Sequence, residues 1–150
     1  GVGAAGLIEW PEGRIRWAPN NAYQALPLRQ LLQDATDLPT VVDNDANAAA
    51  WAEAKIGHQA SHMAFLTVGT GIGGGLILDN RLYRGKTGLG AEVGHLIVDP
   101  SGDHQCNCGN IGCLEALASG TALGRYGSAA AAGRPDGGPG RRGRGWLGGG

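Results

Sequence analysis

The 150-residue chain is about the length of one domain, and its 42% hydrophobic content can support a buried core. Its 29 glycines predict many turns and loops, but they show no three-residue period, so a collagen-like structure is excluded. A net charge of −1 gives no reason to expect nucleic acid or an acidic membrane as a partner, and the longest stretch without a charged residue or histidine, residues 63–78, is too short to span a bilayer.

The first part of the chain predicts two helices and a short strand. The opening GVGAAG is typical of a strand end that enters a glycine loop. Apolar residues recur at helical spacing over 28–35, and β-branched residues follow as a strand at 40–42. The alanine-rich segment 46–56, with a glycine directly after it, is the clearest helix of the sequence.

The second part alternates strands with a helix. Residues 63–68 are the best candidate for a buried strand, and a hairpin is predicted from 73–78 and 81–84. A second single strand is predicted at 92–98, before a polar loop, and a final helix is predicted at 114–123. This alternation of strands and helices favours an α/β architecture.

The last segment, 127–150, differs in composition from the rest. Ten of its residues are glycine, and it carries four arginines but one aspartate. Such a segment buries too little apolar surface to offset its ordering entropy, so we expect a disordered low-complexity Gly/Arg tail, with RNA or phosphate binding by its arginines as the alternative. The chain opens without methionine, and we expect it to be an internal piece of a longer protein.

Four potential metal ligands lie close together in the sequence: His95, Cys106, Cys108 and Cys113. Their number and type suit a closed tetrahedral zinc site, and a zinc with four protein ligands is structural because no position remains open for water. Free thiols beside an unrelated histidine are the alternative. An odd number of clustered cysteines does not suit a disulfide framework, and no secretory signal opens the chain, so we expect a cytoplasmic protein.

A glycine run follows the strand predicted at 63–68. Gly69, Gly71 and Gly74 satisfy the GxGxxG pattern, but a dinucleotide site requires a helix next and a hairpin is predicted instead. The backbone amides of such a turn, with the hydroxyl of Thr70, could bind an anion such as phosphate. A tight hairpin without a ligand is the alternative.

A cluster of Asp43, Asn44 and Asp45 lies directly before the alanine-rich helix. It does not fit a calcium loop, because the required glycine and glutamate are missing. Asp45 could cap the helix, or it could accept a proton as a general base, since a helix N-terminus favours a negative charge. Glu92 and Glu115, which flank the cysteine cluster in sequence, are further polar candidates.

Residues 1–126 closely resemble the ROK family of sugar kinases and sugar-responsive repressors, and within it the bacterial glucokinases. The resemblance rests on four segments in the family's order: VVDNDANAAAWAEAKIG, LTVGTGIGGGLILDNRLYRG, GAEVGH and CNCGNIGCLEALASGTAL. It implies an actin-like (ribonuclease H-like) α/β fold of two lobes, incomplete here. Residues 1–60 would belong to the smaller lobe and hinge, and residues 61–126 to the larger lobe with the zinc loop.

The resemblance also implies a reaction and the residues that carry it. The protein would transfer phosphate from Mg-ATP to the 6-hydroxyl of a hexose, with glucose as the expected sugar and Asp45 as the catalytic base. The remaining implied contacts fall into three groups: sugar binding by Asn44, Gly71, Glu92, His95 and Glu115; phosphate binding by Gly69, Thr70 and Gly71; and zinc binding by His95 and the three cysteines. A homodimer is usual in the family.

Two features of the family are missing from this chain. No DxGxT phosphate loop is present, and the adenosine-binding region that follows the zinc loop in the family is replaced by the Gly/Arg tail. We therefore expect an incomplete ATP site and poor phosphorylation by this chain alone. The alternatives are the sugar-sensing domain of a ROK repressor, a kinase for N-acetylmannosamine, N-acetylglucosamine or fructose, and a zinc-stabilised fragment without a ligand.

Overall fold

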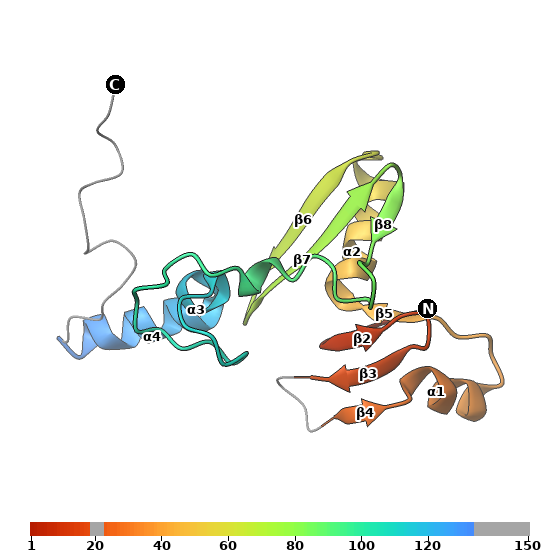
Figure 1. The fold of residues 1–150 in the computed structure, drawn as a ribbon, viewed down its shortest axis with the longest axis horizontal. Helices are drawn as coiled ribbons and strands as arrows, with labels where there is room; N and C mark the ends of the chain where they lie inside the picture. Colours follow the sequence, from red (N-terminus) through yellow and green to blue (C-terminus); the bar gives the residue numbers. More distant parts are fainter. Residues whose placement is uncertain (19–22, 134–150) are drawn as a thin grey trace. The chain divides into compact units, whose positions relative to one another are not determined.

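The computed structural model describes residues 1–18 and 23–133, and Figure 1 shows their helices and strands. The chain forms two compact units. The first unit comprises Gly1–Thr67 and Gly73–Gly94, and the second comprises Val68–Ile72 and His95–Gly150. Most of the tail predicted at 127–150 lies outside the described residues, although the last helix extends into it as far as Ala131.

Two small sheets form the N-terminal part of the first unit. Strand β1 (Val2–Ala4) pairs in parallel with β5 (Val42–Asn44), and an antiparallel sheet contains β2 (Leu7–Glu9), β3 (Arg14–Trp17) and β4 (Gln24–Leu26). The core beneath them consists of Ile8, Ile15, Ala18 and Val42, all at most 3% exposed. The sequence analysis assigned no strand between residues 7 and 26, because these strands are short and interrupted by proline and glycine.

Helix α1 (Leu28–Thr36) confirms the helix predicted from apolar spacing. It ends at Asp37, whose backbone takes a left-handed conformation with φ of 55° and donates a hydrogen bond to the carbonyl of Gln33. The next strand, β5, covers Val42–Asn44, two residues later than the strand predicted at 40–42. The strand therefore ends on the polar cluster and delivers it directly to the next helix.

The alanine-rich helix is also confirmed. Helix α2 spans Asp45–Ala52 and continues as a π-helical turn over Glu53–Gly57. Its alanines lie against glycines of strand β7 (Ile72–Leu78): a Cβ atom on Gly73 would lie 3.1 Å from the Cβ of Ala46, and one on Gly75 would overlap the Cβ of Ala50. Part of the glycine run thus permits close packing of helix against sheet, and Figure 1 shows α2 beside these strands.

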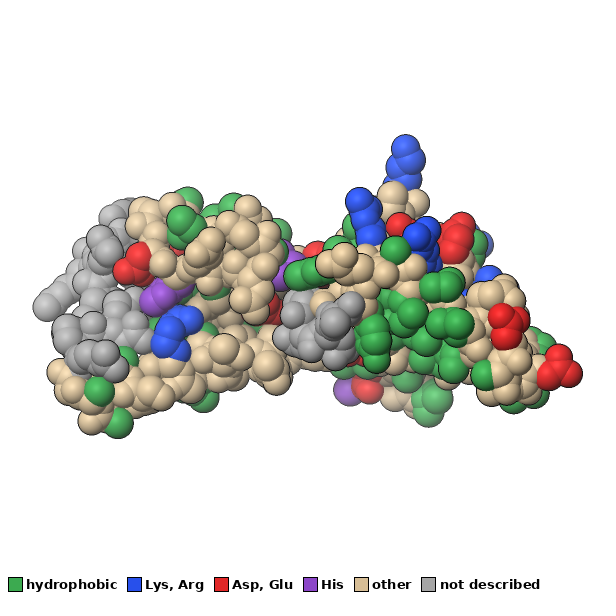
Figure 2. Space-filling view, turned by 90° about the horizontal axis from the view of Figure 1, so that it is seen from below, with side chains coloured by type: hydrophobic (Ala, Val, Ile, Leu, Met, Phe, Trp, Pro, Cys, Tyr) green, Lys and Arg blue, Asp and Glu red, His purple; other side chains and the backbone are tan. Residues whose placement is uncertain are grey.

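The third sheet contains β6 (Met63–Val68), β7 (Ile72–Leu78) and β8 (Arg81–Tyr83) in that order, which confirms the predicted strand and hairpin. The expectation that 63–68 is a buried strand is wrong. Its residues alternate between half-buried and exposed, and Leu66 and Val68 are 51% and 68% exposed. Only one face of this strand is covered, as in a half-buried sheet. Figure 2 shows that hydrophobic side chains lie at the molecular surface.

Two helices follow the cysteine loop in the second unit. The single helix predicted at 114–123 is divided into α3 (Leu114–Ala118) and α4 (Gly120–Ala131) by Ser119, whose backbone is extended. The stretch 92–98 is not a strand: it contains a 3-10 turn at Val93–His95 and an isolated bridge from Ile97 to Cys113. Among the described residues, no helix combines the length and apolar character that crossing a bilayer requires.

Candidate functional site

The second unit brings the four predicted metal ligands together. The ligand atoms of His95, Cys106, Cys108 and Cys113 all lie within 4.8 Å of one another. The Sγ atoms of Cys108 and Cys113 are 3.7 Å apart, and Nδ1 of His95 is 3.5 Å from Sγ of Cys106. The sulfur separation is far longer than a disulfide bond of about 2.05 Å, so the cysteines are not paired covalently.

These distances fit a zinc ion. At the tetrahedral angle, two sulfur ligands that are each about 2.3 Å from a zinc ion lie about 3.8 Å apart. A sulfur and a nitrogen ligand of the same ion lie about 3.5 Å apart. The observed separations of 3.7 and 3.5 Å match both values. The four residues could therefore hold a tetrahedral metal with little rearrangement. Protein ligands would then occupy all four coordination positions, and none would remain for a catalytic water.

The thiols differ in how readily they ionise. Burial raises the pKa of Cys113 to about 12, and burial also raises that of Cys106. Burial acts in the same direction on Cys108, but hydrogen bonds from Asn110 and the neighbouring thiols bring its pKa below the ordinary value. At neutral pH without metal, at least two thiols are protonated, so binding a metal to three thiolates would release protons.

The backbone around Gly112 holds the cysteine loop in its folded-back shape. Gly112 has a φ of +75°, and a Cβ atom there would overlap the backbone of Asp99. Its amide donates to the carbonyl of His104, and its carbonyl accepts from the amide of Val98. Gly109 also has a positive φ, of +95°. Both glycines therefore take left-handed conformations, which glycine adopts more readily than other residues.

The predicted glycine turn, residues 69–71, lies in the same unit and is fixed by the two helices that follow the cysteine loop. The amide of Gly120 donates to the carbonyl of Gly69 at 2.7 Å, and the hydroxyl of Thr121 donates to the carbonyl of Thr70 at 2.8 Å. The carboxylate of Glu115 accepts from the amide of Ile72 at 2.8 Å. A Cβ atom on Gly71 would overlap this carboxylate, so a larger residue there would displace the end of the Glu115 side chain.

Fewer amides of this turn are available to an anion than the sequence suggested. The amide of Gly69 donates to the carbonyl of Gly71, and that of Ile72 is occupied by Glu115. In the described part of the chain, the amides of Thr70 and Gly71 donate to no other group. Two neighbouring amides and the Thr70 hydroxyl therefore remain for a phosphate, instead of the whole run.

The first unit contains the predicted acidic residue at the start of α2. Asn44, not Asp45, is the N-cap: its Oδ1 accepts from the amides of Ala46 and Asn47 at 2.9 and 3.1 Å. Its Nδ2 also donates to the carbonyl of Gly6. Asp45 is exposed, and its Oδ1 shares the amide of Ala46 at 3.0 Å. Its other carboxylate oxygen accepts from no described group.

Two residues near this helix start were not assigned a role from the sequence. Asp43 forms an ion pair with Arg84, with Nη2 and Oδ2 2.8 Å apart. The two residues are 41 positions apart, so spacing gave no sign of the pair. Glu92, which the sequence did suggest as a polar site residue, is exposed and also lies in the first unit.

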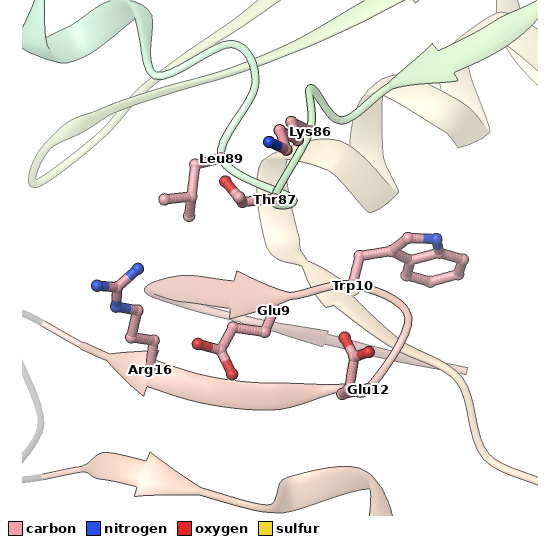
Figure 3. A pocket seen from close by; sticks show the side chains of 7 residues that line it. All are labelled: Glu9, Trp10, Glu12, Arg16, Lys86, Thr87 and Leu89. Atoms are coloured by element: carbon pink, nitrogen blue, oxygen red, sulfur yellow. The ribbon is translucent and has the colours of Figure 1, made fainter.

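A hollow of about 340 Å³ opens between the β2–β3 turn and the loop after β8, both in the first unit (Figure 3). Its charged lining consists of Glu9, Glu12, Arg16 and Lys86, and Trp10 also contributes to its wall. None of the residues singled out in the sequence lines it. Four charges of balanced sign give it no preference for anions or cations.

Comparison with known proteins gives a consistent result. The sequence model of the ROK family matches residues 1–136. A glucokinase of Halalkalibacterium halodurans is 43% identical over 127 residues, covering 83% of this chain and 38% of that protein. A xylose repressor of Caldicellulosiruptor bescii is 45% identical over 125 residues, covering 82% of this chain and 31% of that protein.

A solved structure is equally similar. The ROK family glucokinase of Streptomyces griseus, determined in complex with glucose and AMPPNP, matches with a TM-score of 0.77 and 44% identity, covering 87% of this chain and 43% of that one. The fold is therefore that of part of an actin-like sugar kinase. The chain spans about two fifths of the length of the glucokinases it matches.

Proposed function

The chain belongs to the ROK family, and from that membership we propose that the protein carrying it transfers phosphate from Mg-ATP to the 6-hydroxyl of a hexose, with glucose as the substrate. The similarity to two glucokinases, one of them determined with glucose and an ATP analogue, supports this reaction. Phosphoryl transfer depends mainly on placement and charge stabilisation, which a carboxylate base, free turn amides and a magnesium ion supply.

The observation that carries the proposal is that Asn44, and not Asp45, caps helix α2. The sequence left open whether Asp45 only caps the helix. Asn44 accepts both cap hydrogen bonds, so Asp45 is exposed with one carboxylate oxygen free of described partners. Asp45 is thereby available to take the proton of the sugar hydroxyl as that oxygen attacks the terminal phosphorus of ATP.

The remaining family contacts are proposed residue by residue. Asn44, Gly71, Glu92, His95 and Glu115 would bind sugar hydroxyls. Gly69, Thr70 and Gly71 would lie at the phosphate, and the two amides that remain free at Thr70 and Gly71 support that role. One carboxylate oxygen of Glu115 accepts from the amide of Ile72, and the other, which has a long contact of 3.9 Å with Sγ of Cys106, would bind the hydroxyl.

We assign zinc to the four-ligand cluster because its ligand separations match tetrahedral coordination. The ion would be structural, holding the cysteine loop and with it the residues that precede α3. We further propose that residues 1–60 and 61–126 belong to two different lobes of the protein, that the protein is a homodimer, and that it acts in the cytoplasm, where thiols stay reduced.

Kinetics of the intact protein with glucose and ATP would test the proposal. General-base assistance is worth about 10² to 10⁴ in rate, so Asp45→Asn should lower kcat by that factor while glucose binding, measured by calorimetry, stays. Asp34→Asn, on exposed α1, is the matched control and should keep full activity. A wild-type protein that phosphorylates no hexose would contradict the proposed reaction, and an unchanged kcat in Asp45→Asn would contradict the role of the base.

A sugar-sensing role is the second candidate, because the xylose repressor is as similar as the glucokinases. The two functions differ in what the protein does with ATP and with DNA. Sugar binding without turnover, together with sequence-specific DNA binding by the intact protein, would favour the sensor.

A further inference from the structure

Arg84, the residue that follows β8, makes two contacts with one oxygen of Asp43. Its Nε and Nη2 atoms each lie 2.8 Å from Oδ2, and the two side chains are 25% and 13% exposed. An ion pair withdrawn from water to this degree leaves an uncompensated charge when one partner is removed. The pair is therefore a stronger constraint than the exposed ion pairs of the chain.

The guanidinium group is also held on its face. The Cζ atom of Arg84 lies 3.8 Å from the ring centroid of Trp10. A planar guanidinium can stack on an aromatic ring and bond a carboxylate at the same time, which an ammonium group does less well. Arg84 is thus fixed both by Trp10 and by Asp43.

The other oxygen of Asp43 reaches the start of α2. Its Oδ1 accepts from the backbone amide of Asn44 at 2.8 Å and from Nδ2 of Asn47 at 3.2 Å. Asn47 is 2% exposed and lies in the first turn of the helix. The orientation of one carboxylate is consequently coupled to the backbone of the residue directly before Asp45.

We propose that Arg84 is a positioning residue for the phosphorylation reaction: through Asp43, and supported by Trp10, it fixes the backbone of Asn44 and hence the placement of Asp45. This inference rests on the proposed function, since it assigns Asp45 the role of base. Arg84 does not act on the substrate itself. Its effect is exerted over three linked contacts, all within the first unit.

The hydrogen bonds at the start of α2 indicate that the contacts of Arg84 and Asp43 orient the Asn44 backbone and are not needed to form the helix. The first free amides of α2 are already capped by Oδ1 of Asn44, so the helix can begin without Arg84. The contact from Asp43 to the Asn44 amide restrains the backbone just before the base. A misplacement of about 1 Å in a reacting group can cost about 10²-fold in rate.

Steady-state kinetics of the intact protein would test the inference. Arg84→Met should lower kcat about 10- to 100-fold while the KM for glucose changes less than about threefold, since Asp45 is the one proposed base whereas Asn44 is one of five proposed sugar contacts. Arg84→Lys, which keeps the charge but not the stacked double contact, should lie between wild type and Arg84→Met. Arg81→Met, an exposed arginine on β8, is the matched control and should match wild type.

A double variant and a direct probe of Asn44 separate this role from a general loss of stability. Asp43→Asn combined with Arg84→Met should be no slower than Arg84→Met alone, because both act through one chain of contacts. The Asn44 amide should exchange its hydrogen at least about tenfold faster in Arg84→Met than in Arg81→Met. If Arg84→Met does not fold, Arg84→Lys and Trp10→Phe provide the same comparison with milder changes.

The outcomes distinguish the two proposals. An active wild type in which Arg84→Met and Arg81→Met have equal kcat contradicts only the positioning role, as does a rise in KM without a fall in kcat. A wild type that phosphorylates no hexose contradicts the proposed function, and the positioning role falls with it.

Discussion

The two units of the chain reach stability by different means. In the first, apolar side chains such as Ile8, Ile15 and Val42 are almost fully buried between short strands and α1. In the second, two of the three residues in the buried cluster around the loop are the metal ligands Cys106 and Cys113. Coordination of the proposed zinc would there take the place that apolar burial has in the first unit.

The surface of the cysteine loop supports this difference. Leu96, Ile97, Val98 and Ile111 are between 47% and 59% exposed, so the apolar residues of the segment contribute little burial. A short loop with few buried side chains cannot offset its ordering entropy by the hydrophobic effect alone. Four ligands on the proposed zinc ion could offset it, and the following experiments test that contrast.

Loss of the metal should produce the largest effect. In zinc-finger peptides at pH 7, the binding of structural zinc contributes about 10–16 kcal/mol to folding. Removal of the ion by chelation, or of one ligand by Cys113→Ser, should therefore unfold the cysteine loop. Hydrogen exchange should rise at amides such as those of Cys106 and Gly112, while the strands of the first unit stay protected.

Asn107→Ala provides the control for this experiment, because Asn107 is exposed and lies between two ligands without being one. It should keep a full equivalent of zinc by elemental analysis. Equal loss of protection in both units, or an unchanged metal content in Cys113→Ser, would contradict the contrast between them.

Truncation in the apolar core should show the reverse pattern. Ile15 is 3% exposed, and Ile15→Ala should cost about 2–5 kcal/mol in the free energy of unfolding of the first unit, measured by urea titration. Zinc affinity should not change. Val41→Ala, at a residue that is 53% exposed, is the control and should cost less than about 0.5 kcal/mol. A large change of zinc affinity in Ile15→Ala would show that the two units are not independent.

Removal of the Glu115 carboxylate would show how strongly α3 stabilises the glycine turn within the second unit. Glu115→Ala leaves the buried amide of Ile72 without its charged acceptor, which should cost about 1.5–3 kcal/mol. Glu115→Gln retains an acceptor and should cost less. Thermal unfolding measures both, and equal losses would show that the hydrogen bond to Ile72 is not what stabilises the turn.

The helix caps offer the smallest and most closely matched comparison. Asn44 accepts from two amides at the start of α2, whereas Ser119 accepts only from the amide of Ala122 at the start of α4. Replacement of a cap by alanine costs about 0.5–2 kcal/mol, so Asn44→Ala should lie nearer the upper end and Ser119→Ala nearer the lower. Chemical denaturation of each variant measures the difference, and the opposite order would contradict it.

Local signals accounted for much of the fold. The alanines of α2, the hairpin of β7 and β8 and the cysteine spacing each carry their information within about twenty residues, and the structure has all three. The burial of β6 could not be predicted, since an apolar run does not say how many of its faces are covered. The break at Ser119 was missed because the apolar pattern continues across it.

The candidate site divides in the same way. The four ligands and the Asn44–Asp45 pair are local motifs, and the structure resolved which of the pair caps the helix. Arg84 was missed because its partner Asp43 lies 41 positions away, in a strand of a different sheet from β8. Contacts of this kind depend on tertiary structure and leave no periodic signal.

The break at Ser119 makes the spacing of the C-terminal segment unusually strict. It lets Glu115 reach the amide of Ile72 from α3, while Gly120 and Thr121 reach the carbonyls of Gly69 and Thr70 from α4. Insertion of one residue in α3 would turn everything beyond it by about 100° around the helix axis. Both sides of the turn could not then be bound at once, so insertions and deletions in this seven-residue span should be more damaging than single substitutions.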